Sequence, residues 1–159
     1  MTTILTGRAF FAAALADITA ARGEILLATY KITPTRQRPA LVLTRTLHAL
    51  EQAARRGVRV QVIAPGPGSR PGPGKSNIPA LARLAAAGAE IRTAGASLTF
   101  HAKILIIDQV VLYLGSHNMT PGSALINYEM SARITHQPAV TAARRSFLAA
   151  GRGLPAPPP

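Results

Sequence analysis

The apolar residues in the first hundred positions repeat one arrangement three times: a stretch with helical spacing, a glycine, and a short apolar run. Glycine directly after a helix commonly takes the left-handed conformation that ends it. The three glycines are Gly23, Gly57 and Gly88. The apolar runs after them end at Tyr30, Ile63 and Ala94. Helices that alternate with short apolar strands predict a β-α-β-α-β arrangement with a largely parallel sheet.

The second half of the chain is predicted to form a hairpin, a strand and a helix. The apolar runs on either side of Asp108 and Gln109 predict a tight turn within a hairpin over 102–114. A strand over 126–134 and a helix over about 137–150 follow from their spacing. The predicted fold class is therefore α/β, with a mixed, largely parallel β-sheet flanked by helices.

The length of 159 residues suits a single domain with a substantial core, and we assign it to residues 1–153. The proline-rich segment 154–159 is expected to be a disordered tail that does not pack. The segment Pro65–Lys75 is too rich in proline and glycine for a helix or strand, so we expect a loop there.

Four polar residues flank the predicted hairpin. His101 and Lys103 are two positions apart, so on a strand their side chains leave the same face. A turn at 108–109 pairs positions that sum to about 217, which places 101 opposite 116 and returns Ser116 and Asn118 beside the first pair. A neutral imidazole can attack phosphorus, while a lysine and an amide stabilise the charge on the phosphoryl oxygens. Each residue alone has an ordinary structural explanation, but their common register favours phosphate chemistry.

The full pattern is H-x-K-x4-D-x6-G-S-x-N, and its six positions are His101, Lys103, Asp108, Gly115, Ser116 and Asn118. This pattern resembles the signature of the phospholipase D superfamily. The similarity extends from the first helix, with Phe10 and Phe11, through Glu129. The resemblance implies a phospholipase D-like α/β sandwich and a covalent phosphohistidine intermediate.

Most members of that superfamily carry the signature twice, whereas this chain carries it once. In this respect it is similar to small bacterial endonucleases that pair two chains across a twofold axis. The resemblance implies a homodimer in which one His101 attacks and the partner-chain histidine protonates the leaving oxygen. It also implies that Glu129 lies beside the histidine and orients it. The alternative is an exposed glutamate paired with a nearby arginine such as Arg133.

The charge balance favours a polyanionic partner. Eighteen basic residues, fifteen of them arginine, stand against six acidic ones, and the formal net charge is +12. Such a field attracts nucleic acid, with DNA the first expectation and RNA the second. With three tyrosines, four phenylalanines and no tryptophan, contacts should follow the backbone rather than the bases. Arg- and Lys-bearing loops are candidate phosphate contacts, and their residues are Arg36, Arg38, Arg70 and Lys75. GC-rich coding and flexible connectors are the ordinary alternatives.

The sequence lacks the residue patterns of metal sites and membrane-spanning segments. The chain has no cysteine, and its four histidines and six acids do not cluster in sequence, so we expect no metal or other cofactor. No apolar run is long enough to span a membrane. The stretch 9–21 resembles a signal segment, but Asp17 interrupts it and its spacing is helical, which favours a cytoplasmic protein.

Asp108 is expected to be structural, because it lies at the far end of the hairpin, about 17 Å along a strand from Lys103. Three functions remain open at this point. The first is a metal-independent endonuclease or phosphodiesterase acting on nucleic acid. The second is a phospholipid hydrolase or phosphatidyl transferase. The third is a catalytically silent nucleic-acid-binding module.

Overall fold

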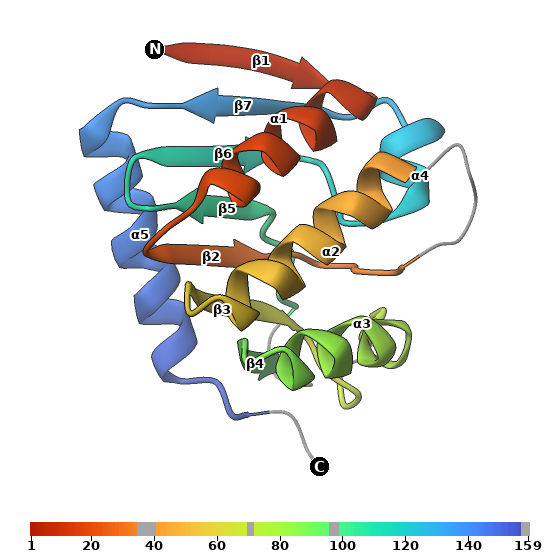
Figure 1. Ribbon diagram of the computed structural model, residues 1–159. Coiled ribbons are helices and arrows are strands. Elements are labelled where there is room, and N and C mark those ends of the chain that lie inside the picture. The colour runs from red at the N-terminus through yellow and green to blue at the C-terminus, as the bar shows by residue number, and fades with distance from the viewer. Residues whose placement is uncertain (35–40, 70–71, 96–98, 157–159) are drawn as a thin grey trace.

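The computed structural model describes residues 1–34, 41–69, 72–95 and 99–156, and these form one seven-stranded sheet with helices on both faces (Figure 1). The strands are β1 (Thr2–Thr6), β2 (Glu24–Ala28), β3 (Arg59–Pro65), β4 (Glu90–Ala94), β5 (Ile104–Ile107), β6 (Val111–Gly115) and β7 (Met130–Ile134). The helices are α1 (Gly7–Ala20), α2 (Leu41–Arg55), α3 (Gly74–Ala86), α4 (Pro121–Leu125) and α5 (Gln137–Arg152). The strand order across the sheet is β1-β7-β6-β5-β2-β3-β4.

The sheet separates two layers of apolar packing. Helices α1, α2 and α3 cover one face, where Phe11, Leu50 and Leu84 pack against alternate strand residues such as Leu27. Helix α5 covers the other face, where Phe147 packs against the intervening strand residues. Strands buried on both faces explain why β2, with all five residues buried, appears in sequence as a continuous apolar run. None of the helices in the described ranges is both long and apolar enough to cross a membrane.

The prediction of a mixed α/β sheet is confirmed, and its parallel part is confined to the predicted β-α-β-α-β segment. Strands β2, β3 and β4 run parallel to one another, as expected for β-α-β-α-β. The other four pairings within the described residues are antiparallel, so the sheet as a whole is not largely parallel. Part of this difference comes from β1, an edge strand that was not predicted because it is short and mostly exposed.

The β5–β6 hairpin forms as predicted, with its register shifted by one residue. Ile104 pairs with Leu114, so partners sum to 218 rather than 217. The cause is a connection of three residues: Asp108 and Gln109 both have positive φ, at 48° and 60°, and Val110 donates its N–H to the Ile107 carbonyl. In this register Ser116 is not level with His101, which corrects the predicted pairing.

The ends of the predicted helices and strands differ in three places. Gly57 and Gly88 have the left-handed conformation, with φ of 89° and 101°, but Gly23 does not. Strand β7 begins at residue 130 rather than 126, because α4 and the turn after it occupy 121–129. The segment from Leu154 was expected not to pack, yet Leu154 contacts the α5-side core and the Pro155 carbonyl accepts the Thr93 N–H of β4 at 3.0 Å.

Candidate active site

Four of the six signature residues lie at one end of the central strands. His101 and Lys103 precede β5, and Ser116 and Asn118 follow β6. Because β5 is antiparallel to both β6 and β2, the start of β5 lies beside the carboxyl ends of the other two strands. The sequence interpretation that the hairpin gathers these side chains is therefore consistent with the fold, despite the shifted register.

His101 and Lys103 contact each other directly. The Lys103 Nζ lies 3.1 Å from His101 Nδ1 and donates to the His101 carbonyl at 2.7 Å. Because an ammonium group is only a donor, Nδ1 accepts in this contact and the proton of the neutral ring lies on Nε2. Burial lowers the pKa of Lys103 below its ordinary value, and the negative charge of Glu129 opposes that shift. The His101 side chain is exposed, as a nucleophile must be to reach a substrate.

Tyr30 is a site residue that the sequence interpretation missed. Its ring lies 4.6 Å from the His101 imidazole between centroids, and the Lys103 Nζ lies 5.3 Å from its centroid. A cation over an aromatic face is attracted to it. Tyr30 lies two residues after the end of β2, and its position at the carboxyl end of a parallel strand is the signal that could have identified it.

A buried asparagine of α3 fixes the segment that carries Tyr30. Asn77 is fully buried, and its Nδ2 donates to the carbonyls of Tyr30 and Pro65 at 3.2 and 3.1 Å. Its Oδ1 accepts the Ile32 N–H at 3.0 Å. A buried side chain whose hydrogen bonds are satisfied specifies one backbone arrangement. Tyr30 is therefore held in place from the helix layer.

Asn118 has its amide oriented by the same segment. Its Oδ1 accepts the Lys31 N–H at 3.1 Å, and its backbone N–H donates to the Ser123 Oγ at 3.1 Å. With the carbonyl oxygen engaged, the Nδ2 group remains as a donor. This is the role that the sequence interpretation gave to Asn118.

Glu129 lies in a network of donors on its own chain. Its carboxylate accepts from Ser116 Oγ, from Ser123 Oγ at 2.9 Å and from Asn127 Nδ2 at 3.1 Å. Burial by itself would raise the pKa of Glu129, but these hydrogen bonds hold it below its ordinary value. The carboxylate is consequently ionised at neutral pH.

The expected contact between Glu129 and His101 is not present within one chain. No hydrogen bond joins the two side chains in the part of the sequence that the structure describes. The ordinary alternative is also wrong, since Arg133 pairs instead with Asp17, at 2.7 Å from Nε to Oδ2. The sequence interpretation took residues 126–129 as strand, whereas the chain turns there and directs Glu129 toward Ser123.

Two signature residues fix the hairpin. The Asp108 carboxylate accepts the backbone N–H groups of Arg22, Gly23 and Glu24 at 2.9, 2.8 and 2.9 Å. Burial would raise the pKa of Asp108, but these donors, Glu24 foremost, hold it below its ordinary value. Gly115 lies so close to β7 that a Cβ atom would overlap Ser131 and the Met130 carbonyl. These contacts support structural roles for both residues.

His117, the unspecified position of the signature, is also buried beside the site. Its ring stacks on Phe10 with 4.3 Å between centroids, and its Nδ1 lies 2.8 Å from the Ser131 Oγ. Within the described residues its Nε2 has no hydrogen-bond partner. Burial lowers the pKa of His117, so the ring is neutral at neutral pH. The His117 side chain therefore contacts both Phe10 of α1 and Ser131 of β7.

Of the four basic residues predicted to contact phosphate, the structure describes only one. Arg36, Arg38 and Arg70 lie outside the described residues. Lys75 was assigned to a loop but lies in the first turn of α3, exposed to solvent. Across the described ranges, no three His, Cys, Asp or Glu side chains are grouped so as to hold a metal ion.

A seven-stranded mixed sheet with this signature at one edge defines a phospholipase D-like protein. Residues 14–150 match the family described as "Cardiolipin synthase, PLD-like domain", so the chain belongs to that family. It is similar to the crystal structure of Nuc, a phospholipase D family member from Salmonella typhimurium, with 21% identity, a TM-score of 0.79 and 98% of each chain covered.

Two other solved structures share the fold. NucT from Helicobacter pylori is similar with 19% identity, a TM-score of 0.75 and 98% of each chain covered. TrmBL2, an archaeal chromatin protein with a novel mode of DNA binding, has 17% identity and a TM-score of 0.62 over 96% of this chain and 53% of its own. No curated protein sequence matched the chain.

Proposed function

We propose that this protein is a metal-independent phosphodiesterase that cleaves nucleic acid, DNA foremost, through a covalent phosphohistidine. The observation that carries the proposal is the convergence of an exposed imidazole, an ammonium group and an amide donor on one sheet edge. The net charge of +12 favours a polyanionic substrate over a neutral one. The similarity to TrmBL2, a DNA-binding protein, is consistent with this substrate class.

The proposed reaction has two displacements at phosphorus. A ring nitrogen of His101 forms a bond to phosphorus while the bond to the leaving oxygen breaks, and that oxygen takes a proton from an acid. Water then attacks phosphorus and gives a proton to the group that acted as the acid, while the bond from phosphorus to the imidazole breaks. Lys103 and the Asn118 amide donate to the non-bridging oxygens in both steps. These groups supply the positive charge and hydrogen bonds that other nucleases take from metal ions.

One chain lacks part of this machinery, which supports an active homodimer. It has one signature histidine to attack and no second one to protonate the leaving oxygen. Its His101 accepts from Lys103 at Nδ1, whereas attack through Nε2 requires a proton on Nδ1 and an acceptor for it. Since Glu129 does not reach His101 on its own chain, we propose that it orients the histidine of the second chain.

The surface beside the site has the character of an interface. Ile126 and Tyr128 precede Glu129 and are 82% and 87% exposed, and Leu114 and Met130 next to Ser116 are also exposed. Large apolar side chains grouped on a surface commonly mark contacts with another protein. We propose that the second chain covers these residues.

We propose that each chain of the dimer contributes one catalytic domain, residues 1–153, and that the protein acts in the cytoplasm. The buried Phe11, Ala14 and Ile18 of α1 support this location, because the segment resembling a signal sequence is part of the core. The remaining segment, 154–159, then has no catalytic role.

The test is digestion of plasmid DNA, single-stranded DNA and RNA by the wild-type protein and by His101→Ala, in excess chelator. We expect cleavage by the wild type with chelator present, and none by the variant. Loss of activity on chelation with recovery on added magnesium would refute the mechanism. Turnover of phospholipid vesicles without nucleic-acid cleavage would instead support a phospholipid hydrolase or transferase. Binding of nucleic acid without any cleavage would support a catalytically silent binding module.

A further inference from the structure

Each of the six acidic side chains of this protein is engaged, and few of the described basic side chains have a carboxylate partner. The six acids are Asp17, Glu24, Glu51, Glu90, Asp108 and Glu129. Each accepts a hydrogen bond or forms an ion pair within the chain. Within the described residues, four of them pair with basic side chains, whereas Asp108 accepts from backbone N–H groups and Glu129 from serine and asparagine side chains. The chain has eighteen basic residues. Counter-ions for the remaining cations must come from another molecule.

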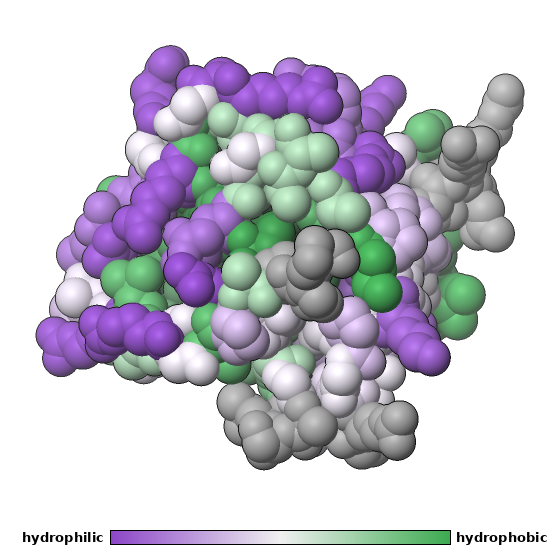
Figure 2. Space-filling view, turned by 90° about the horizontal axis from the view of Figure 1, so that it is seen from below, coloured by the Kyte–Doolittle hydropathy of each residue, from purple (hydrophilic) through white to green (hydrophobic). Residues whose placement is uncertain are grey.

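Two of these cations, Arg145 and Arg152, line a pocket at the opposite end of the β5–β6 hairpin from His101. The pocket has a volume of about 230 Å³ and lies between α5 and the turn of the β5–β6 hairpin. Its lining residues are Gln109, Thr141, Arg144, Arg145, Leu148 and Arg152. Figure 2 shows hydrophilic side chains gathered along the left edge of the molecule, on the side where α5 lies in Figure 1. We call this site the α5 pocket.

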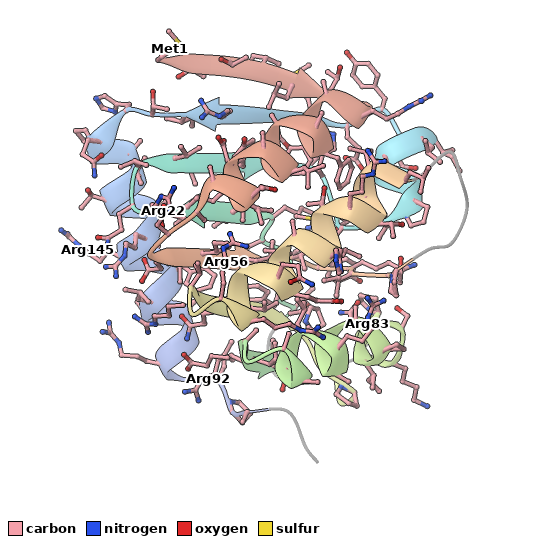
Figure 3. All side chains as sticks on the ribbon, in the orientation of Figure 1. Met1, Arg22, Arg56, Arg83, Arg92 and Arg145 are labelled. Atoms are coloured by element: carbon pink, nitrogen blue, oxygen red, sulfur yellow. The ribbon has the colours of Figure 1, made fainter. Side chains whose placement is uncertain are left out.

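The arginines of the α5 pocket are arranged by the helix. Positions 141, 145, 148 and 152 recur at helical spacing and form one stripe of α5. Arg144 is held by the buried Glu24, with Nε at 2.7 Å and Nη2 at 3.0 Å from its two oxygens. Arg145 projects outward from α5 (Figure 3), and neither it nor Arg152 has a carboxylate partner in the described ranges.

Interaction with the helix dipole explains the presence of an unpaired arginine at Arg152 but not at Arg145. Arg152 lies in the last turn of α5, where a cation interacts favourably with the helix dipole. Arg145 is about two turns earlier, so the dipole does not account for it. The turn that forms the opposite wall is itself fixed, because Gln137 donates through Nε2 to the Gln109 carbonyl at 2.9 Å. The pocket is therefore a feature of the folded chain with two unpaired guanidinium groups.

We infer that the α5 pocket is an accessory binding site for a phosphodiester group of the nucleic-acid backbone. Guanidinium groups bind phosphate through paired N–H donors, and Thr141 adds a hydroxyl. The pocket is smaller than most sites for whole small molecules, which suits one phosphate group rather than a nucleotide. This inference rests on the proposed function, since it assigns a second contact to the same substrate.

The position of the α5 pocket implies that only a polymer occupies both sites. The pocket adjoins the closed end of the β5–β6 hairpin, and the candidate active site lies at its open end. Strands of this length separate the two sites by roughly 15 Å or more. In a duplex, where successive phosphates of one strand rise by about 3.4 Å, roughly five nucleotides cover that distance. Bound substrate would thus be held by α5 while another phosphate lies at His101.

The experiment measures DNA binding in a His101→Ala background, so that no cleavage can occur. A labelled duplex of about 30 base pairs, longer than the span between the sites, is titrated at several salt concentrations. The variants are Arg145→Gln, Arg152→Gln and both together. Arg55→Gln is the matched control, because Arg55 is an exposed arginine at the end of α2, on the other face of the sheet. Melting temperatures verify that each variant is folded, and Arg→Ala changes, which also remove the charge, replace any that is not.

We expect the double variant to bind DNA roughly tenfold more weakly. The slope of the logarithm of its binding constant against the logarithm of salt concentration should fall in magnitude by about one to two, as for the loss of two phosphate contacts. Arg55→Gln should stay within about twofold of the parent, and an RNA duplex should show the same pattern, because the backbone phosphates are shared. Equal losses in the control and the pocket variants would refute the site in favour of a general charge effect.

Unchanged DNA binding in the double variant would also refute the inference. A loss confined to vesicles of anionic lipid would replace it with a membrane contact. Nucleic-acid cleavage by the wild-type protein is measured separately. If the pocket variants bind as expected but the wild type does not cleave, the proposed catalysis fails and the binding site stands.

Discussion

Replacing Asp108 by asparagine tests whether a signature residue can be structural. Asn tolerates the positive φ of 48° at this position, so the turn itself should persist. The change instead alters the three hydrogen bonds that the carboxylate accepts from Arg22, Gly23 and Glu24. An amide oxygen can still accept from Gly23 and Glu24, which share Oδ1, but its NH₂ group would face the Arg22 N–H.

The expected cost follows from these contacts. Hydrogen bonds to a charged group contribute about 1.5–3 kcal/mol and neutral ones about 0.5–1.5 kcal/mol, so two weakened bonds and one lost bond sum to roughly 4 kcal/mol. Two of the three bonds are exposed to solvent, where water replaces part of the loss. We therefore expect about 2 kcal/mol, which for a chain of this size lowers the melting temperature by roughly 4–8 °C.

The assay is thermal unfolding of the wild type and Asp108→Asn across pH, together with turnover at a temperature where both are folded. Because the pKa of Asp108 is lower in the folded state, its contribution is present above its ordinary value of 3.8 and is lost as the pH falls through the folded value. The difference between the two proteins should therefore shrink in acid. A variant with wild-type stability but no turnover would refute the structural role.

Three further predictions concern the site. Because the pKa of His117 is lowered in the folded state, the contribution of His117 to stability is present above its ordinary pKa of 6.5 and is lost as the pH falls below that value. His117→Phe should remove this part of the dependence of melting temperature on pH. An unchanged dependence would contradict the argument that burial keeps His117 neutral. Glu129→Gln should fold but lose roughly 10²-fold in turnover, and near-normal turnover would leave Glu129 as a structural hub for Ser116. Excess His101→Ala chains mixed with active chains should reduce activity in proportion to heterodimer formed, whereas a fully active monomer in sedimentation would exclude the shared site.

The sequence was sufficient to predict the β5–β6 hairpin and the four polar residues that it brings to one end of the strands. Two apolar runs with Asp108 between them determine an antiparallel pair, and alternation then brings both ends of the signature together. A shift of one residue in register did not disperse the site, because His101, Lys103, Ser116 and Asn118 all lie outside the paired strands.

The contacts that orient the site could not be predicted in the same way. Asp108 binds backbone groups 84 to 86 residues away, and Tyr30 reaches His101 from another strand. Glu129 was assigned to the wrong partner because α4 has only five residues and gives no periodic signal. Such contacts depend on how separate elements pack, which local patterns in a sequence do not specify.

The docking of Leu154 and Pro155 on β4 has a consequence for experiments with shortened proteins. β4 is the last strand of the sheet, and the Thr93 N–H is occupied by the Pro155 carbonyl while Arg92 Nη1 donates to the Leu154 carbonyl at 3.3 Å. A fragment cut before Leu154 would leave these groups on an uncovered strand edge, which readily pairs with a strand of another molecule. Self-association of such a fragment through β4 would imitate the proposed dimer in sedimentation while leaving the two His101 residues far apart.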